Sequence, residues 1–254
     1  VTSMRVHLDE VASWDADLQT VQETRLTMQG QQIVAEQLKE CGWQFFCGHH
    51  QESRSGGVWD APQGGVAIMV RQGWAARLIK PEKGDELANA LWKSTRFVHV
   101  HLMTGNGATA MNVISCYGVP QNRQLNDDLF QLVVKYTIRL GNVPLVLAGD
   151  FNFELDSQGS YPLAVLNEVI AKRLVDADQM MAQLRGDKPV ARFHDGSART
   201  EPTRIDGVLM NTNMASAVQS VEAVRDTGIP GHTPIKVLLD MAQPAQRVLK
   251  PRVL

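Results

Sequence analysis

The chain has 254 residues, of which 44% are hydrophobic and 20% are charged, an ordinary composition for a globular protein. Its formal net charge of −2 gives no overall positive field that would indicate a nucleic-acid partner. A catalytic site rich in acidic residues would itself lower the net charge, so this value excludes little. No stretch approaches 18 uninterrupted apolar residues, which excludes a transmembrane helix. Three cysteines exclude a disulfide framework and favour a reducing compartment.

Helix-like and strand-like segments alternate along the chain, as judged from apolar periodicity and from Gly, Ser and Pro between the segments. In chain order we expect helix 6–14, strand 17–22, helix 29–40, strands 43–47, 65–71, 76–79, 96–103 and 109–117, helix 122–140, strand 143–148, helix 161–172, and strands 204–210, 217–224 and 234–239. This order favours two sheets packed face to face with helices outside. We expect one domain over residues 1–241, followed by a linker or tail over 242–254. Alternation also predicts a solvated strand face carrying His99 and His101.

Polar side chains follow two of the expected strands at the points where those strands end. Glu23 closes the first strand, and a carboxylate there can bind a hard cation such as Mg²⁺ through oxygen. A later apolar strand delivers Gly149, then Asp150 and Asn152 two residues apart and therefore on the same side. The Asp can activate a water and the Asn amide can donate to a phosphate oxygen. The alternative is a plain strand-to-turn signal, since both residue types favour turns.

A second group of polar residues lies later in the chain and on one earlier strand. Asp206 stands inside an otherwise apolar strand, where a carboxylate needs a partner. His232, at the start of the strand two further along, can supply that partner, because an Asp–His hydrogen bond fixes the imidazole tautomer and raises its basicity. Tyr117 ends a strand with a phenol that could reach a phosphate, although a tyrosine there more often only packs.

In this order, the motifs resemble those of the endonuclease/exonuclease/phosphatase superfamily, which includes deoxyribonuclease I and the abasic-site endonucleases. The match covers roughly residues 1–239 and rests on Gln22-Glu23, Gly149-Asp150-Phe151-Asn152, Arg204-Ile205-Asp206 and the block Gly231-His232-Thr233-Pro234. The resemblance implies a four-layer α/β sandwich of the deoxyribonuclease I type. It also implies a site where the two sheets meet at one edge.

The resemblance assigns a metal and a phosphate to this site. Glu23 would be the ligand of a Mg²⁺ ion, with Mn²⁺ as an alternative. Asp150 would activate or orient the attacking water, or handle the leaving-group proton. Asn152 would hold the phosphate and position Asp150.

The remaining roles concern charge on the phosphate. Asp206 would orient His232, which would stabilise charge on the phosphoryl oxygens, and Tyr117 would contact the phosphate. Such a set is chemically consistent, because phosphoryl transfer needs little covalent chemistry from the protein but much positioned charge stabilisation.

Two features depart from the family pattern. The family usually begins with a strand that ends in an Asn near the metal, and Val1-Thr2-Ser3 resembles the residues that come directly after that Asn. We therefore expect the first strand to be absent, and the chain to be less active and less stable than one extended upstream. Gly231 stands where the family typically has an Asp before the catalytic His. Because that Asp adds negative charge near the metal, its replacement bears on metal affinity.

Three runs, 21–26, 64–68 and 203–206, look most like the endonuclease domains of LINE-type (non-LTR) retrotransposons. Those domains nick DNA and lie upstream of a reverse transcriptase. The resemblance therefore implies a DNA substrate, fusion to further domains such as a reverse transcriptase, and an intracellular location, nuclear if the host is a eukaryote. Thr203 and Arg204 would contact the substrate.

Two other functions remain open from the sequence. A phosphatase acting on a small or lipid phosphate would require a concentrated Lys/Arg cluster, and none lies near the motifs. A degenerate domain that only binds nucleic acid or protein is supported by Gly231 and the missing strand, but the retained acids and imidazole argue against it. The basic segment 184–204 and the loop around Trp59 are candidates for DNA contact, with a solvated loop and a packing Trp as the alternatives.

Overall fold

The computed structural model describes residues 7–50, 64–103, 107, 109–190, 193, 202–224, 227 and 231–241. The described strands form three sheets, of six, three and two strands. The described helices are α1 (Leu8–Ser13), α2 (Met28–Glu40), α3 (Glu86–Lys93), α4 (Arg123–Arg139), α5 (Leu163–Ile170), α6 (Ala177–Arg185) and α7 (Thr212–Ala215), with one 3₁₀ turn at Gln158–Ser160. No helix in this part of the chain is long and apolar enough to cross a membrane.

The largest sheet has the order β4-β5-β6-β7-β9-β8. Its strands are β4 (Ala75–Leu78), β5 (Phe97–Met103), β6 (Thr109–Tyr117), β7 (Leu145–Asp150), β8 (Leu174–Asp176) and β9 (Asp206–Asn211). Neighbouring strands run antiparallel except β6 and β7, which are parallel. A parallel pair needs a long crossover connection, and α4 provides it. As a result, β6 and β7 end at the same edge of the sheet.

Two smaller sheets lie against one face of the large sheet. One has the order β1-β3-β2, from β1 (Leu18–Gln22), β3 (Val66–Arg71) and β2 (Trp43–Cys47), and the other pairs β10 (Val218–Ala223) with β11 (Ile235–Leu239). Both contribute to one apolar core with the large sheet, since Ile68 and Val221 share a cluster with Val113 and Met210. An ion pair between Lys236 Nζ and Asp15 Oδ2, 3.1 Å long, joins β11 to the segment before β1.

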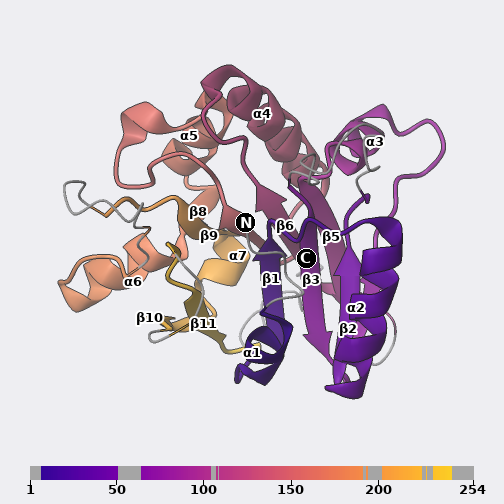
Figure 1. Ribbon diagram of the computed structural model, residues 1–254. Coiled ribbons are helices and arrows are strands. Elements are labelled where there is room, and N and C mark those ends of the chain that lie inside the picture. The colour runs from indigo at the N-terminus through magenta and orange to yellow at the C-terminus, as the bar shows by residue number, and fades with distance from the viewer. Residues whose placement is uncertain are drawn as a thin grey trace, which may run out of the picture.

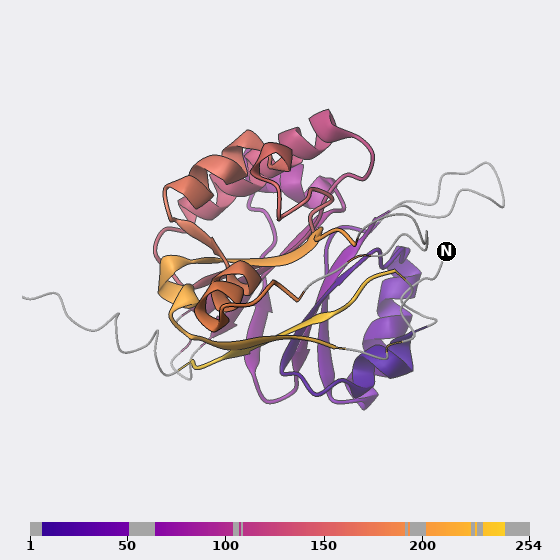
Figure 2. The same ribbon diagram turned by 90° about the vertical axis from the view of Figure 1, so that its left-hand side faces the viewer.

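Helices cover both outer faces, as Figures 1 and 2 show. On the large sheet, Ile114 and Leu147 point away from the sheet interface and pack with Phe130 of α4 and Val165 of α5. On the three-stranded sheet, Met69 packs with residues of α1 and α2. Since alternate strand residues face opposite ways, the six-stranded and the three-stranded sheets each pack residues on both faces. The layers run helix, sheet, sheet, helix, which confirms the predicted four-layer sandwich.

The structure corrects several details of the expected elements. It adds helices α3, α6 and α7 and strand β8, and the strand expected over 143–148 spans Leu145–Asp150. His99 and His101 do share one strand face, but His99 is only 1% exposed because α4 covers it. Its ring nitrogens contact Tyr136 Oη at 2.9 Å and Asn112 Oδ1 at 3.0 Å. Burial lowers the pKa of His99 to about 3, so it is a neutral core residue.

The predicted absence of a first strand stays a prediction. Within the described residues, β1 pairs only with β3 and β11 pairs only with β10. The expected tail, residues 242–254, lies outside the described residues.

Candidate active site

Strand ends from both sheet layers meet at one edge of the sandwich. The parallel register of β6 and β7 places Tyr117 beside Asp150, and the antiparallel register of β7 and β9 places Asp150 opposite Asp206. Glu23 follows β1 of the smaller sheet, and its carboxylate accepts a hydrogen bond from the Tyr117 hydroxyl. Four of the predicted site residues are thereby brought together from chain positions that are far apart.

His232 completes this group from the segment before β11. Its Nδ1 lies 2.8 Å from Asp206 Oδ2, the partner that the sequence predicted. Ligand atoms of Asp150, Asp206 and His232 all lie within 4.8 Å of one another. If Nδ1 carries the proton that Asp206 accepts, Nε2 is left to face a substrate. The ring of Phe193 packs against the imidazole, with ring centroids 4.6 Å apart.

Asp150 is a buried acid beside a second acid. It is 6% exposed, and burial together with the negative charge of Asp206 raises its pKa to about 7. The charge of His232 and the N–H of Asn152, which donates to Asp150 Oδ1 at 3.0 Å, act in the opposite direction. A carboxyl group with a pKa near neutrality can both accept and release a proton at physiological pH, as general acid–base catalysis requires.

The two other titratable partners are shifted as well. Burial alone would lower the pKa of His232, but the hydrogen bond to Asp206 and the charges of Asp206, Asp150 and Glu23 raise it above its ordinary value. Burial, with the hydrogen bond to Glu23, raises the pKa of Tyr117 well above its usual range. At neutral pH the phenol is therefore a hydrogen-bond donor, and the neighbouring carboxylates favour the positively charged form of the imidazole.

The backbone is unusual at this edge. Glu23 has φ 53° and Asn152 has φ 52°, both in the left-handed region that side chains other than glycine seldom adopt. Hydrogen bonds from Thr24 N to Gly65 O and from Arg25 N to Gly64 O hold the turn that presents Glu23. Such strain collects at functional sites, where the surrounding structure imposes it.

Asn152 is held in place on the other side of the site. Its Nδ2 donates to Gly118 O at 3.2 Å, so the amide is already oriented by the end of β6. Asn126, buried on α4, donates to Phe151 O and accepts from Val119 N. The segment after β7 is therefore fixed against the segment after β6.

The donor set fits a hard divalent cation. Carboxylate oxygens are the ligands that Mg²⁺ prefers, and Asp150 and Asp206 supply them close together beside His232. Glu23 does not belong to this close group, and its predicted role as the metal ligand stays a prediction. Burial and the charge of Asp206 raise the pKa of Asp150, and a bound cation would relieve the repulsion between the two acids. Glu23 is 43% exposed at its side chain and reachable from solvent, although its Oε2 is ion-paired with Arg25 Nη2 at 2.8 Å. Asp150, Asp206 and His232 thus fit a divalent cation.

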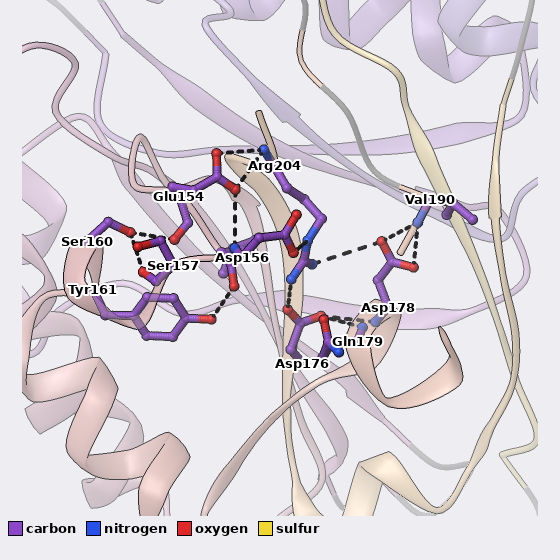
Figure 3. A network of polar contacts seen from close by, with 11 residues as sticks. Glu154, Asp156, Ser157, Ser160, Tyr161, Asp176, Asp178, Gln179, Val190 and Arg204 are labelled. Atoms are coloured by element: carbon purple, nitrogen blue, oxygen red, sulfur yellow. Dashed lines mark hydrogen bonds and ion pairs between the residues drawn. The ribbon is translucent and has the colours of Figure 1, made fainter. Parts of the chain in front are cut away.

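The structure contradicts the predicted substrate contact by Arg204. Its side chain is fully buried, and the guanidinium is ion-paired inside the protein with Asp156 and Asp176 (Figure 3). The strand begins only at Asp206, so the alternation that would have turned Arg204 outward does not extend to it. Thr203 is exposed and exchanges backbone hydrogen bonds with Phe193. Its role toward a substrate stays a prediction.

Four residues of the site were missed from the sequence. Arg25 pairs with Glu23, Arg96 lies 4.6 Å over the Tyr117 ring, Asn126 fixes the loop after β7, and Phe193 packs on His232. Asn126 could have been found, because it is a polar residue on the apolar stripe of an expected helix. The others depend on contacts between distant segments. Within the suggested DNA-contact regions, Trp59, Arg192 and Arg199 lie outside the described residues.

This fold and site define a hydrolase that acts on phosphate esters. A sequence model of the Endonuclease/Exonuclease/phosphatase family matches residues 8–227, so the chain belongs to that family. Among curated proteins, none matches the chain.

Solved structures show the same fold at low sequence identity. A 3'-5' exonuclease (NExo) from Neisseria meningitidis is 21% identical with a TM-score of 0.64, covering 94% of this chain and 96% of that one. An AP endonuclease from Archaeoglobus fulgidus is 15% identical with a TM-score of 0.69 and the same coverage of 94% and 96%. The endonuclease domain of TRAS1, a telomere-specific non-LTR retrotransposon, is 14% identical with a TM-score of 0.63, covering 94% and 93%.

Proposed function

We propose that this protein is a Mg²⁺-dependent endonuclease that nicks DNA and forms the catalytic domain of a retrotransposon-like polyprotein. The observation that carries the proposal is the convergence of Glu23 and Tyr117 with Asp150, Asp206 and His232 from the two sheet layers at one edge. Acids, a phenol and a paired imidazole at one point suit a reaction in which charge develops on phosphoryl oxygens.

Each side chain has a task that its environment supports. Asp150 accepts the proton of the attacking water, for which its pKa near 7 is suited. His232, held by Asp206, donates a hydrogen bond from its outer ring nitrogen to a phosphoryl oxygen. Tyr117 and Asn152 orient the phosphate and the carboxylates around it. A divalent cation bound by these carboxylates would neutralise charge on the phosphate and on the leaving oxygen.

DNA is favoured as the substrate by the proteins that share this fold. Structures named as an AP endonuclease and as a retrotransposon endonuclease domain share it over more than nine-tenths of this chain. The runs 21–26, 64–68 and 203–206 favour the retrotransposon class, and with it fusion to a reverse transcriptase and an intracellular, in a eukaryote nuclear, location.

The proposal is tested by incubating supercoiled plasmid with the purified chain and Mg²⁺. We expect conversion to the nicked circle, blocked by EDTA and reduced about 100-fold or more by Asp150→Ala. Asp85→Ala, which removes an acid at the N-terminus of α3, is the matched control and should nick normally. Turnover of an inositol phosphate with no nicking would replace the proposal with a phosphatase. Plasmid binding without any turnover would favour a non-catalytic domain.

A further inference from the structure

Arg204 is a fully buried arginine only two residues from Asp206. Its Nε lies 2.8 Å from Asp156 Oδ1, its Nη2 lies 2.8 Å from Asp176 Oδ2, and its Nη1 lies 3.9 Å from Asp178 Oδ2. Figure 3 shows the three carboxylates around the guanidinium. Burial would lower the pKa of Arg204, but the charges of these acids and their hydrogen bonds outweigh it, so the side chain stays charged.

The backbone of Arg204 is tied to the segment that follows Asp150. Its N–H donates to both carboxylate oxygens of Glu154, at 3.0 and 3.1 Å, and its carbonyl accepts from Leu155 N at 2.8 Å. One residue on, Ile205 O accepts from Phe151 N at 2.8 Å. Beyond the paired residues Asp150 and Asp206, hydrogen bonds therefore still join the two segments, and Arg204 takes part in them.

The acids around Arg204 also belong to other elements. Asp176 ends β8 and caps α6 by accepting from the backbone N–H groups of Asp178 and Gln179. Asp178 accepts from Val190 N at 2.9 and 2.8 Å. The guanidinium thus links three parts of the chain, which are the loop that follows β7, the end of β8 and the first turn of α6. Arg204 itself lies just before β9, so these links also hold the start of that strand. A rigid support of this kind is what keeps catalytic groups in productive geometry.

We propose that Arg204 is a positioning residue, which acts through its bonds to Glu154 and Asp156 to fix Asp206, and thereby His232, opposite Asp150. The inference rests on the proposed nuclease function and replaces the substrate contact that the sequence suggested. Arg204 touches neither substrate nor cation. Its effect on the reaction is carried by the backbone between residues 204 and 206.

The test compares two variants that disrupt this network, Arg204→Lys and Glu154→Leu, with two controls, Glu154→Gln and Arg139→Lys. Arg204→Lys retains the charge but cannot span Asp156 and Asp176 together, since the ammonium lacks the guanidinium fork. Glu154→Leu removes the acceptor for Arg204 N, and Glu154→Gln keeps an amide oxygen there. Arg139→Lys is the matched control, because Arg139 is ion-paired with Asp85 at 2.8 Å between α3 and α4.

We expect Arg204→Lys and Glu154→Leu to lower kcat for plasmid nicking about 10-fold with KM changed less than 2-fold, since a loss of geometry at the reacting atoms acts on kcat. Glu154→Gln and Arg139→Lys should stay within about 2-fold of the unmodified chain in both constants. A merely structural role would lower the melting temperature and leave kcat unchanged at temperatures well below it. That result overturns the proposal. A rise in KM alone also overturns it, because it would indicate that Arg204 contacts the substrate directly.

A second measurement separates this inference from the proposed function. Amide hydrogen exchange reports the bonds from Phe151 N and Leu155 N without any substrate, with Tyr117 N, bonded to Arg96 O at 2.9 Å, as the internal reference. In Arg204→Lys we expect the first two amides to exchange at least about 10-fold faster and the reference to be unchanged. If the chain never nicks DNA but this pattern holds, the proposed function fails and the positioning role stands. Unchanged exchange at Phe151 and Leu155 overturns the positioning role.

Discussion

Asp150 and Asp206 stand directly opposite each other on the paired strands β7 and β9, so a buried carboxylate lies beside a partly buried one. Burial of Asp150, and then the negative charge of Asp206, oppose ionisation of Asp150 and raise its pKa to about 7. In most strand pairs such an arrangement only destabilises the sheet. Here the paired carboxylates create a negative charge that either a bound cation or a proton can neutralise.

The first prediction concerns pH and the cation-free protein. Asp150 has a folded pKa of about 7 against roughly 3.9 when unfolded, so its protonated form favours the fold. The contribution of protonated Asp150 to the free energy of unfolding is fully present below about pH 4 and is lost as the pH rises to about 7. Asp150→Asn removes that loss and should be more stable than the unmodified chain at pH 8 by about 4 kcal/mol, with the difference shrinking toward pH 4.

Urea melts from pH 4 to pH 8 in EDTA measure this difference. Asp85→Asn is a control of opposite sign, because the hydrogen bond to Arg139 lowers the pKa of Asp85. Its contribution is present above the unfolded pKa and lost only as pH falls through the lower folded value, so Asp85→Asn should be less stable than the unmodified chain at pH 8. Parallel pH curves for Asp150→Asn and the unmodified chain would show that Asp150 is not the buried acid described.

The second prediction concerns Gly231, the position where the family typically carries an acid. Gly231 has φ 83°, so an Asp there would have to adopt a left-handed backbone beside His232. We expect Gly231→Asp to cost about 1 kcal/mol of stability in EDTA and to bind Mg²⁺ about 10-fold more tightly, because it adds negative charge to the site. Gly231→Asn has the same backbone demand without the charge. Titration calorimetry giving equal Mg²⁺ affinities for the two variants would sink the electrostatic explanation.

The sequence was sufficient for the architecture because apolar periodicity is strong in the long elements. Val113 and Ile114, or Val146 and Leu147, face opposite cores as alternation requires. Elements with little periodicity, such as β8 with three residues, had no such signal. Glu23, Tyr117, Asp150, Asp206 and His232 were also brought together, since each lies at or near the end or the start of a strand.

Arg204 shows why other side chains could not be placed from the sequence. It lies beside the Asp206 motif in a polar stretch, and a charged residue there reads equally well as a surface group. Its burial depends on three acids from a loop and from the region of β8 and α6, 26 to 48 positions away in the chain. His99 was misplaced for the same reason, because the helix that covers it comes later in the chain.

The third prediction concerns the phenol that bridges the two sheets. Tyr117→Phe removes the hydrogen bond to Glu23 and leaves the ring in its place under Arg96. We expect kcat to fall about 10-fold, with a free energy of unfolding lowered by about 1 kcal/mol. Since the pKa of Tyr117 is raised far above neutrality, the phenol is protonated throughout the working range, and the loss should be independent of pH between 6 and 9. A loss that grows with pH would mean that the phenolate, not the phenol, acts.

The fourth prediction concerns Gly149, which precedes Asp150 and has φ 152°. A Cβ at this position would lie 1.8 Å from Cys116 O on the neighbouring strand, so the β6–β7 pair can close only around a glycine. Gly149→Ala should therefore lower the free energy of unfolding by about 3 kcal/mol or more, and it should abolish nicking by parting Tyr117 from Asp150. Gly141→Ala, with φ 68° and open space around its Cβ, isolates the cost of the backbone conformation and should lose only about 1 kcal/mol. Equal losses in urea melts of the two variants would mean that β6 and β7 are not packed as closely as described, and the geometry that joins the phenol to the catalytic acids would have to be abandoned.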